Sequence, residues 1–461
     1  MSFFKKIASV FSVFLLLFGA SIVPADALTT RQERELGDKL LEAVHAHYDV
    51  INDPLINDYI DSLGEKLTRE LPPQPFEFSY HVIREDKFNA FAGPGGNIFI
   101  FSGLIEAMDT ENELAAIMAH EIAHVTAGHI PDMIERSQRT GYASMAGMIA
   151  GILVGLGGAP SAGAAISLGS IAAGQTMMLS YSREHELQAD FLGLKTLEDA
   201  GYHEYGMLSA LKRIRSREWF GEDEIPTYLK THPAAAERMA MLGGTMTADP
   251  AALKNTYAFD RARMRIMALY GNRGNALNRL SRMARADPEN PAIQYGLGLV
   301  LAEGGNPEKG ISHLETAASL KPDDPHITIA LGKAFFLAGD NTKAIETLKA
   351  IDDIQQYGPE GMIVLGRTRM SEGDNREVVE TFKKLLDHYP NDRQALFFLG
   401  QSLGQQGDLA EAHYFLGRYH KAERNFENAR FHFDRALSKA RDPEKKADIE
   451  KRMDALDPDQ E

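Results

Sequence analysis

Two histidines and a glutamate lie within about one turn of a predicted helix, at a spacing that suits a metal ion. His120 and His124 are four residues apart, so on a helix their side chains project about 40° apart and point to one side. Two imidazoles at this spacing can hold one Zn²⁺ ion, and Glu121 lies beside them, where it can take a proton from water at the metal. This stretch therefore predicts hydrolytic metal chemistry.

A third ligand is needed, and residues 181–190 supply the candidates. Glu186 and Asp190 are again four residues apart, so they share one face of a helix. One of them can bind the metal while the other orients a ligand histidine through its second ring nitrogen; Glu184 is the alternative to Glu186 as the ligand. The chain has no cysteine, so a metal here must be held by histidines and carboxylates.

The elements that must position these side chains can be read from the same region. Thr110 is a predicted N-cap with Glu113 three residues later, the capping-box spacing, so a helix should run from there through the histidines. Before it, residues 76–82 and 97–101 have the pattern of β-strands. We expect residues 98–101 to form an edge strand above the metal, which pairs with an extended substrate peptide; a plain hairpin is the alternative. The predicted substrate-strand residues are Asn89, Phe91, Gly95 and Gly96.

A further histidine nearby, His129, is not a predicted ligand. On a continuous helix it lies about 140° around the axis from His124. We therefore expect it to face away from the metal and to have a structural role.

Three motifs occur together in a fixed order. They are Asn-Ala-Phe-Ala-x-Pro-Gly-Gly-x-Ile from Asn89, His-Glu-Ile-Ala-His from His120, and Tyr-Ser-Arg-x-x-Glu-x-x-Ala-Asp from Tyr181. With these motifs the chain resembles the HtpX and CAAX-prenyl-protease family of zinc metallopeptidases. The resemblance implies one zinc ion per chain and a zincin-like domain. It implies the zinc ligands His120, His124 and Glu186, the catalytic base Glu121, and the supporting carboxylate Asp190.

The same resemblance assigns two residues further along the chain. His232, in Thr-His-Pro, matches a loop histidine that can occupy the open zinc position and keep such an enzyme latent. Arg238 matches an arginine near the reaction centre, and we expect it to act there as a catalytic residue that stabilises the developing oxyanion.

The C-terminal half is a repeat array. A Leu-Gly pair recurs every 34 residues, at 297, 331, 365 and 399, and a Gly-Asn or Gly-Asp pair recurs at 305, 339, 373 and 407. This period resembles that of tetratricopeptide repeats, in which each helix pair hides its apolar face against the next. A final pair that turns near Asn425 and ends with a helix after Pro443 should cap the stack.

Composition and the N-terminus limit where the protein works. The net charge of −16 and the lack of a basic patch argue against a nucleic-acid partner. Two lysines precede an apolar stretch over residues 7–20, and residues 25–27 read Ala-Asp-Ala. We predict a signal peptide over residues 1–27, cleaved near Ala27; an uncleaved membrane anchor over residues 3–23 is the alternative.

The predicted fold is α+β and predominantly helical. It consists of a zinc metallopeptidase domain over residues 28–255 and a tetratricopeptide-repeat α-solenoid over residues 256–461. Residues 141–179, rich in Gly, Ala, Met and Ile, separate His124 from Glu186. They form either a lid over the site or a segment that contacts a membrane.

The resemblance also implies a biological role. It indicates a protease in the periplasm of a Gram-negative bacterium, acting in quality control and assembly of outer-membrane proteins. Its clients would be unfolded or stalled outer-membrane proteins, and its repeats would contact them or their assembly machinery. Two alternatives stay open: a chaperone or assembly scaffold that works mainly through its repeats, and a membrane-inserted protease that uses residues 141–179.

Overall fold

The computed structural model describes residues 28–139, 181–216, 227–246, 249–373 and 375–456. The chain divides into two compact units, one of Met1–Val50 and Asp61–Lys254 and the other of Ile51–Ile60 and Asn255–Glu461. The predicted signal peptide and the segment 141–179 lie outside the described residues. No helix in the described part of the chain combines the length and apolarity needed to cross a membrane.

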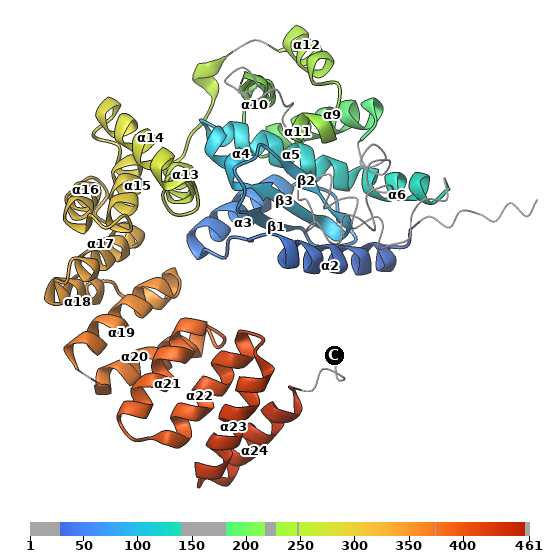
Figure 1. The fold of residues 1–461 in the computed structure, drawn as a ribbon. Coiled ribbons are helices and arrows are strands. Elements are labelled where there is room, and N and C mark those ends of the chain that lie inside the picture. Colours follow the sequence, from blue (N-terminus) through green and yellow to red (C-terminus); the bar gives the residue numbers. More distant parts are fainter. Residues whose placement is uncertain (1–27, 140–180, 217–226, 247–248, 374, 457–461) are drawn as a thin grey trace, which may run out of the picture. The chain divides into compact units, whose positions relative to one another are not determined.

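A three-stranded sheet lies at the centre of the first unit (Figure 1). Its strands are β1 (Ser79–Ile83), β2 (Ala90–Ala92) and β3 (Asn97–Phe101), in the order β1-β3-β2. β3 pairs parallel with β1 and antiparallel with β2. The prediction that residues 98–101 form an edge strand is therefore wrong. All five residues of β3 are buried, as expected of a central strand covered on both faces, and β2 takes the edge position.

Helices cover both faces of this sheet. On one face, α2 (Thr30–His47) supplies Leu40 and Val44 to an apolar cluster with Phe91 and Phe99, whose rings stack with centroids 4.7 Å apart. The 3₁₀ turn Pro94–Gly96 also packs against α2. On the other face lies α5 (Glu111–Thr126), which contacts both β2 and β3.

The start of α5 is fixed by a capping box, as predicted. The Thr110 side chain accepts from the backbone N–H of Glu113, whose carboxylate in turn accepts from the backbone N–H of Thr110 at 3.2 Å. The same carboxylate accepts hydrogen bonds from Ser209 and Arg213 on α10 (Tyr205–Ser216). Every residue of α5 from Glu111 to Val125 is buried, so this helix is packed on all sides within the unit.

The remaining elements of the first unit surround this core. They are α4 (Ser102–Ala107), α6 (His129–Arg139), α9 (Arg183–Asp199), α11 (Thr227–Thr231), α12 (Ala235–Thr245), the 3₁₀ turn η3 (Pro250–Ala252), and α3 (Pro54–Thr68) from residue 61 onward.

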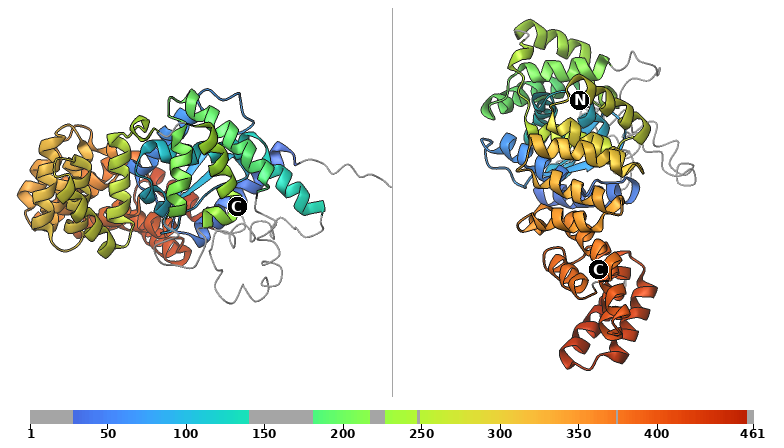
Figure 2. Two further views of the ribbon diagram at one scale, coloured as in Figure 1. Left: turned by 90° about the horizontal axis from the view of Figure 1, so that it is seen from above. Right: turned by 90° about the vertical axis from the view of Figure 1, so that its left-hand side faces the viewer.

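The second unit is a stack of paired helices (Figure 2), which confirms the predicted repeat array. Its helices are α13 (Tyr257–Leu269), α14 (Arg273–Ala286), α15 (Pro291–Ala302), α16 (Pro307–Leu320), α17 (Pro325–Leu337), α18 (Asn341–Lys349), α19 (Glu360–Glu372), α20 (Asn375–His388), α21 (Arg393–Gln405), α22 (Leu409–Ala422), α23 (Phe426–Lys439) and α24 (Pro443–Asp454), with a 3₁₀ turn η4 (Ile354–Tyr357).

The repeating glycines have two physical roles in this stack. A Cβ at Gly366 would lie 2.4 Å from the Phe382 ring, so only glycine lets α19 and α20 approach this closely. The glycines at 305, 339, 373 and 407 each adopt a φ between +80° and +83° at the turn within a helix pair, a conformation that other residues rarely adopt.

Candidate metal centre

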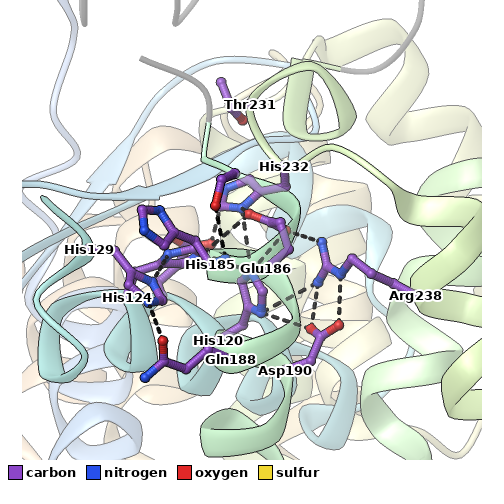
Figure 3. Close-up of polar contacts among 12 residues, drawn as sticks. His120, His124, His129, His185, Glu186, Gln188, Asp190, Thr231, His232 and Arg238 are labelled. Atoms are coloured by element: carbon purple, nitrogen blue, oxygen red, sulfur yellow. Dashed lines mark hydrogen bonds and ion pairs between the residues drawn. The ribbon is translucent and has the colours of Figure 1, made fainter. Parts of the chain in front are cut away.

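Four side chains meet in the interior of the first unit (Figure 3). They are His120 and His124 of α5, Glu186 of α9, and His232, which directly follows α11. One ligand atom from each lies within 4.8 Å of all the others, and all four residues are buried. The sequence separates these residues by as much as 112 positions, and the packing of α9 and α11 against α5 brings them together.

The three predicted ligands converge closely. His120 Nε2 lies 3.1 Å from His124 Nε2. Glu186 Oε2 lies 3.6 Å from His120 Nε2, and Glu186 Oε1 lies 3.5 Å from His124 Nε2. Two imidazoles and one carboxylate in this proximity are the donor set of hydrolytic zinc sites. The residues present therefore fit a metal ion.

His232 lies against this cluster. Its Nδ1 atom is 3.1 Å from Glu186 Oε1 and 3.4 Å from His120 Nε2. The ring stacks on Tyr228 with centroids 4.3 Å apart, and the His232 backbone N–H bonds to the Tyr228 carbonyl. The structure thus places a fourth nitrogen donor beside the three predicted ligands.

Among the described residues of the centre, Glu121 is the one acidic side chain without a hydrogen bond. The residue is fully buried, and within the described residues neither carboxylate oxygen has a hydrogen-bond partner; His232 Nε2 lies 3.5 Å from Glu121 Oε1. Burial raises the pKa of its carboxyl group. A buried carboxylate left without donors is suited to receive a proton from a bound molecule.

Asp190 and Arg238 contact two of the predicted ligands, His120 and Glu186. Asp190 Oδ1 lies 3.0 Å from His120 Nδ1, and Arg238 donates to both oxygens of Asp190, at 2.8 and 2.7 Å. Arg238 also pairs with Glu186. Burial alone would raise the pKa of Asp190. The pKa is nevertheless lowered, because His120 and then Arg238 stabilise the carboxylate by hydrogen bonds and charge.

The expectation that Arg238 acts on reacting atoms stays a prediction, and the contacts of this residue suit a positioning role as well. Its guanidinium is fully buried and pairs with the carboxylates of Glu186 and Asp190. The charge is therefore used to balance and orient these two acids. We assign Arg238 this positioning role.

The expectation for His129 is wrong in one part only: His129 is outside the group of four clustered donors in the described residues, as expected, but it does not face away from His124. α5 ends at Thr126, Gly128 follows with a φ of +69°, and α6 begins at His129. The chain turns back at this glycine, and His129 Nδ1 comes to lie 2.9 Å from Nδ1 of His124. The glycine before His129 is a helix-stop signal that could have revealed this.

The predicted substrate-strand residues divide into two groups. Phe91 packs with residues of α2, and the turn that holds Gly95 and Gly96 contacts both α2 and α5, so their substrate role stays a prediction. Asn89 is fully buried at the start of the edge strand β2, and neither atom of its amide has a hydrogen-bond partner among the described residues. Its neighbour Phe88 accepts a hydrogen bond from the backbone of Tyr228.

Two tyrosines of the centre were not predicted. The Tyr181 ring stacks on His124 with centroids 3.6 Å apart, and Tyr228 stacks on His232. Both rings are buried. Tyr181 lies in a motif that the sequence displays, whereas nothing in the local sequence marks Tyr228.

Comparison with known proteins gives the family. Residues 54–246 match the model of peptidase family M48. This stretch is therefore an M48 peptidase domain. Residues 271–325, 301–360 and 363–416 match models of the tetratricopeptide repeat, so the M48 domain is followed by a repeat region.

Several curated relatives share one name. The chain is 32% identical over 253 residues to the beta-barrel assembly-enhancing protease of Yersinia pestis, which covers 54% of this chain and 51% of the relative. It is 30% identical over 280 residues to that of Escherichia coli K12 (60% and 57%). It is 33% identical over 284 residues to a putative one of Vibrio cholerae (60% and 58%). The matches thus span little more than half the length of these relatives.

Proposed function

We propose that this M48 protein is a zinc-dependent endopeptidase of the Gram-negative periplasm that acts in quality control and assembly of outer-membrane proteins. The observation that carries the peptidase assignment is the buried cluster of His120, His124 and Glu186 beside the carboxylate of Glu121, which has no hydrogen-bond partner among the described residues. The name shared by the relatives supports an outer-membrane role. The domain boundaries at residues 28–255 and 256–461 and cleavage near Ala27 belong to this proposal.

In the proposed reaction each residue of the chain has a separate task. His120, His124 and Glu186 hold the metal, and a zinc ion so held acidifies water and polarises a peptide carbonyl. Glu121 accepts a proton from the attacking water and passes it to the leaving amine. Asp190 fixes the orientation of His120, and Arg238 fixes Glu186 and Asp190.

Substrate and partner roles follow from the same assignment. We assign the start of the edge strand β2, at Asn89, as the place where an extended client peptide pairs. Unfolded or stalled outer-membrane proteins are the proposed clients, and the repeats are the proposed contact to them or to the assembly machinery. The roles of residues 141–179 as a lid or as a peripheral membrane contact stay alternatives.

Metal content tests the proposal directly. Purified wild-type protein is expected to contain about one zinc ion per chain and to cleave casein, because three buried donors converge on one point. The Glu186→Gln variant should bind zinc more weakly and lose cleavage. The matched control is Glu184→Gln, on the exposed side of α9 two residues away, which should match the wild type. Wild-type protein that takes up no zinc would contradict the proposal.

The position of His232 indicates that this residue keeps the peptidase latent. Because its Nδ1 atom lies beside the three ligands, it can fill the position that a water molecule needs. The His232→Ala variant is therefore expected to cleave casein several-fold faster than the wild type, with zinc content unchanged. Rates are compared at equal zinc loading; a variant that is slower than or equal to the wild type would show that His232 is no latch.

A further inference from the structure

The two ligand histidines of α5 differ in what holds their second ring nitrogen. His120 presents its Nδ1 to the carboxylate of Asp190, at 3.0 Å. His124 presents its Nδ1 to another imidazole ring, at 2.9 Å from His129 Nδ1. We propose that His129 is a positioning residue that holds His124 in its ligand orientation through this imidazole–imidazole hydrogen bond. The inference rests on the proposed metal centre.

The hydrogen positions of this contact follow from the geometry. Nε2 of His124 faces the ligand cluster, 3.5 Å from Glu186 Oε1, and a nitrogen that binds a metal carries no hydrogen. Nδ1 of His124 must then carry the hydrogen and donate it, so Nδ1 of His129 is the acceptor. The hydrogen of neutral His129 is left on Nε2, which lies 3.2 Å from the amide oxygen of Gln188. Both ring nitrogens of His129 thus have a partner of the right kind.

The ring of His129 is held in place from other sides as well. His185 stacks on it with centroids 4.2 Å apart and planes inclined by 14°, and His185 Nε2 is itself 2.9 Å from Asp132 Oδ2. His129 is only 2% exposed. A ring buried between His185 and His124 has little freedom to rotate, and this is what a positioning residue requires.

The test measures zinc affinity by competition with a chromophoric chelator on the full chain. His129→Phe keeps a ring that can stack on His185 but removes the acceptor. His129→Asn removes the ring but keeps a carbonyl oxygen that can accept the hydrogen from His124. Loss of such a partner typically weakens metal binding by roughly 10- to 100-fold. The zinc affinity of His129→Phe should fall by this factor, and the zinc affinity of His129→Asn should stay close to that of the wild type.

A second readout separates positioning from packing. Gln188→Glu places a charged acceptor behind His129 and should tighten zinc binding, and the visible absorption of Co²⁺-loaded protein should shift in His129→Phe. Unfolding in excess chelator reports the stability of the metal-free chain. The inference is overturned if His129→Phe binds zinc as tightly as the wild type, or if Phe and Asn weaken binding equally. Wild-type protein without zinc would overturn the proposed function together with it, whereas the first two outcomes leave that function intact.

Discussion

Replacement of Glu121 by glutamine is expected to lower kcat for peptide hydrolysis by roughly 10²- to 10⁴-fold, the usual contribution of a general base. Glutamine has nearly the same size and fits the same buried space, but it cannot accept the proton. Zinc content should not change, because Glu121 is outside the group of ligand atoms. The measurement is kcat on a model peptide with zinc quantified in the same sample.

The same variant separates the enzyme from the scaffold. Glu184→Gln serves again as the matched control, since it removes a carboxylate from an exposed site. Full activity of Glu121→Gln would refute its role as the base. Cells that carry the inactive variant should fail in outer-membrane protein assembly if proteolysis is the main task. Cells that assemble these proteins normally would show that the repeats carry the main function.

Replacement of Arg238 by methionine is expected to destabilise the M48 domain by about 3–5 kcal/mol, the usual effect of removing one partner from a buried ion pair. Methionine replaces much of the side-chain volume but leaves the buried carboxylates of Glu186 and Asp190 without their cation. The measurement is urea unfolding in excess chelator, because a bound metal would supply part of the missing positive charge.

A double variant provides the control for Arg238. Arg238→Met with Asp190→Asn removes one of the two stranded charges, so it should be more stable than the single variant Arg238→Met. A loss of less than about 1 kcal/mol in the single variant would contradict the assignment of Arg238 as the residue that balances the two acids.

The parts of the centre that the sequence revealed are those set by local periodicity. The i, i+4 spacing of the two histidines and the capping box at Thr110 are properties of one helix, and both are present in the structure. The prediction that His129 faces away from His124 was wrong because it assumed that the helix continues through Gly128. The contacts of Arg238 depend on how α12 packs against α5 and α9, which no local pattern encodes.

The fold shows the same division. The repeat helices could be predicted because the same turn and packing positions recur every 34 residues. The position of β3 could not, because an alternating pattern and a continuous apolar run both suit a strand, and only the partners decide which strand is central. The pairing of β3 with β1 on one side and with β2 on the other puts it at the centre.

The turn glycines of the repeats bear on how such proteins vary in length. Three of these turns close through the same pair of backbone hydrogen bonds: at residues 305–306, 339–340 and 407–408, the two N–H groups bond to carbonyls three and five residues back. Because these closures are local and units of such arrays contact mainly their neighbours, a whole unit beyond α19, which pairs with Arg265 of α13 through Glu360, can be gained or lost while the rest of the stack keeps its conformation. Evolution can therefore change the reach of the array in steps of one repeat without touching the chemistry of the M48 domain.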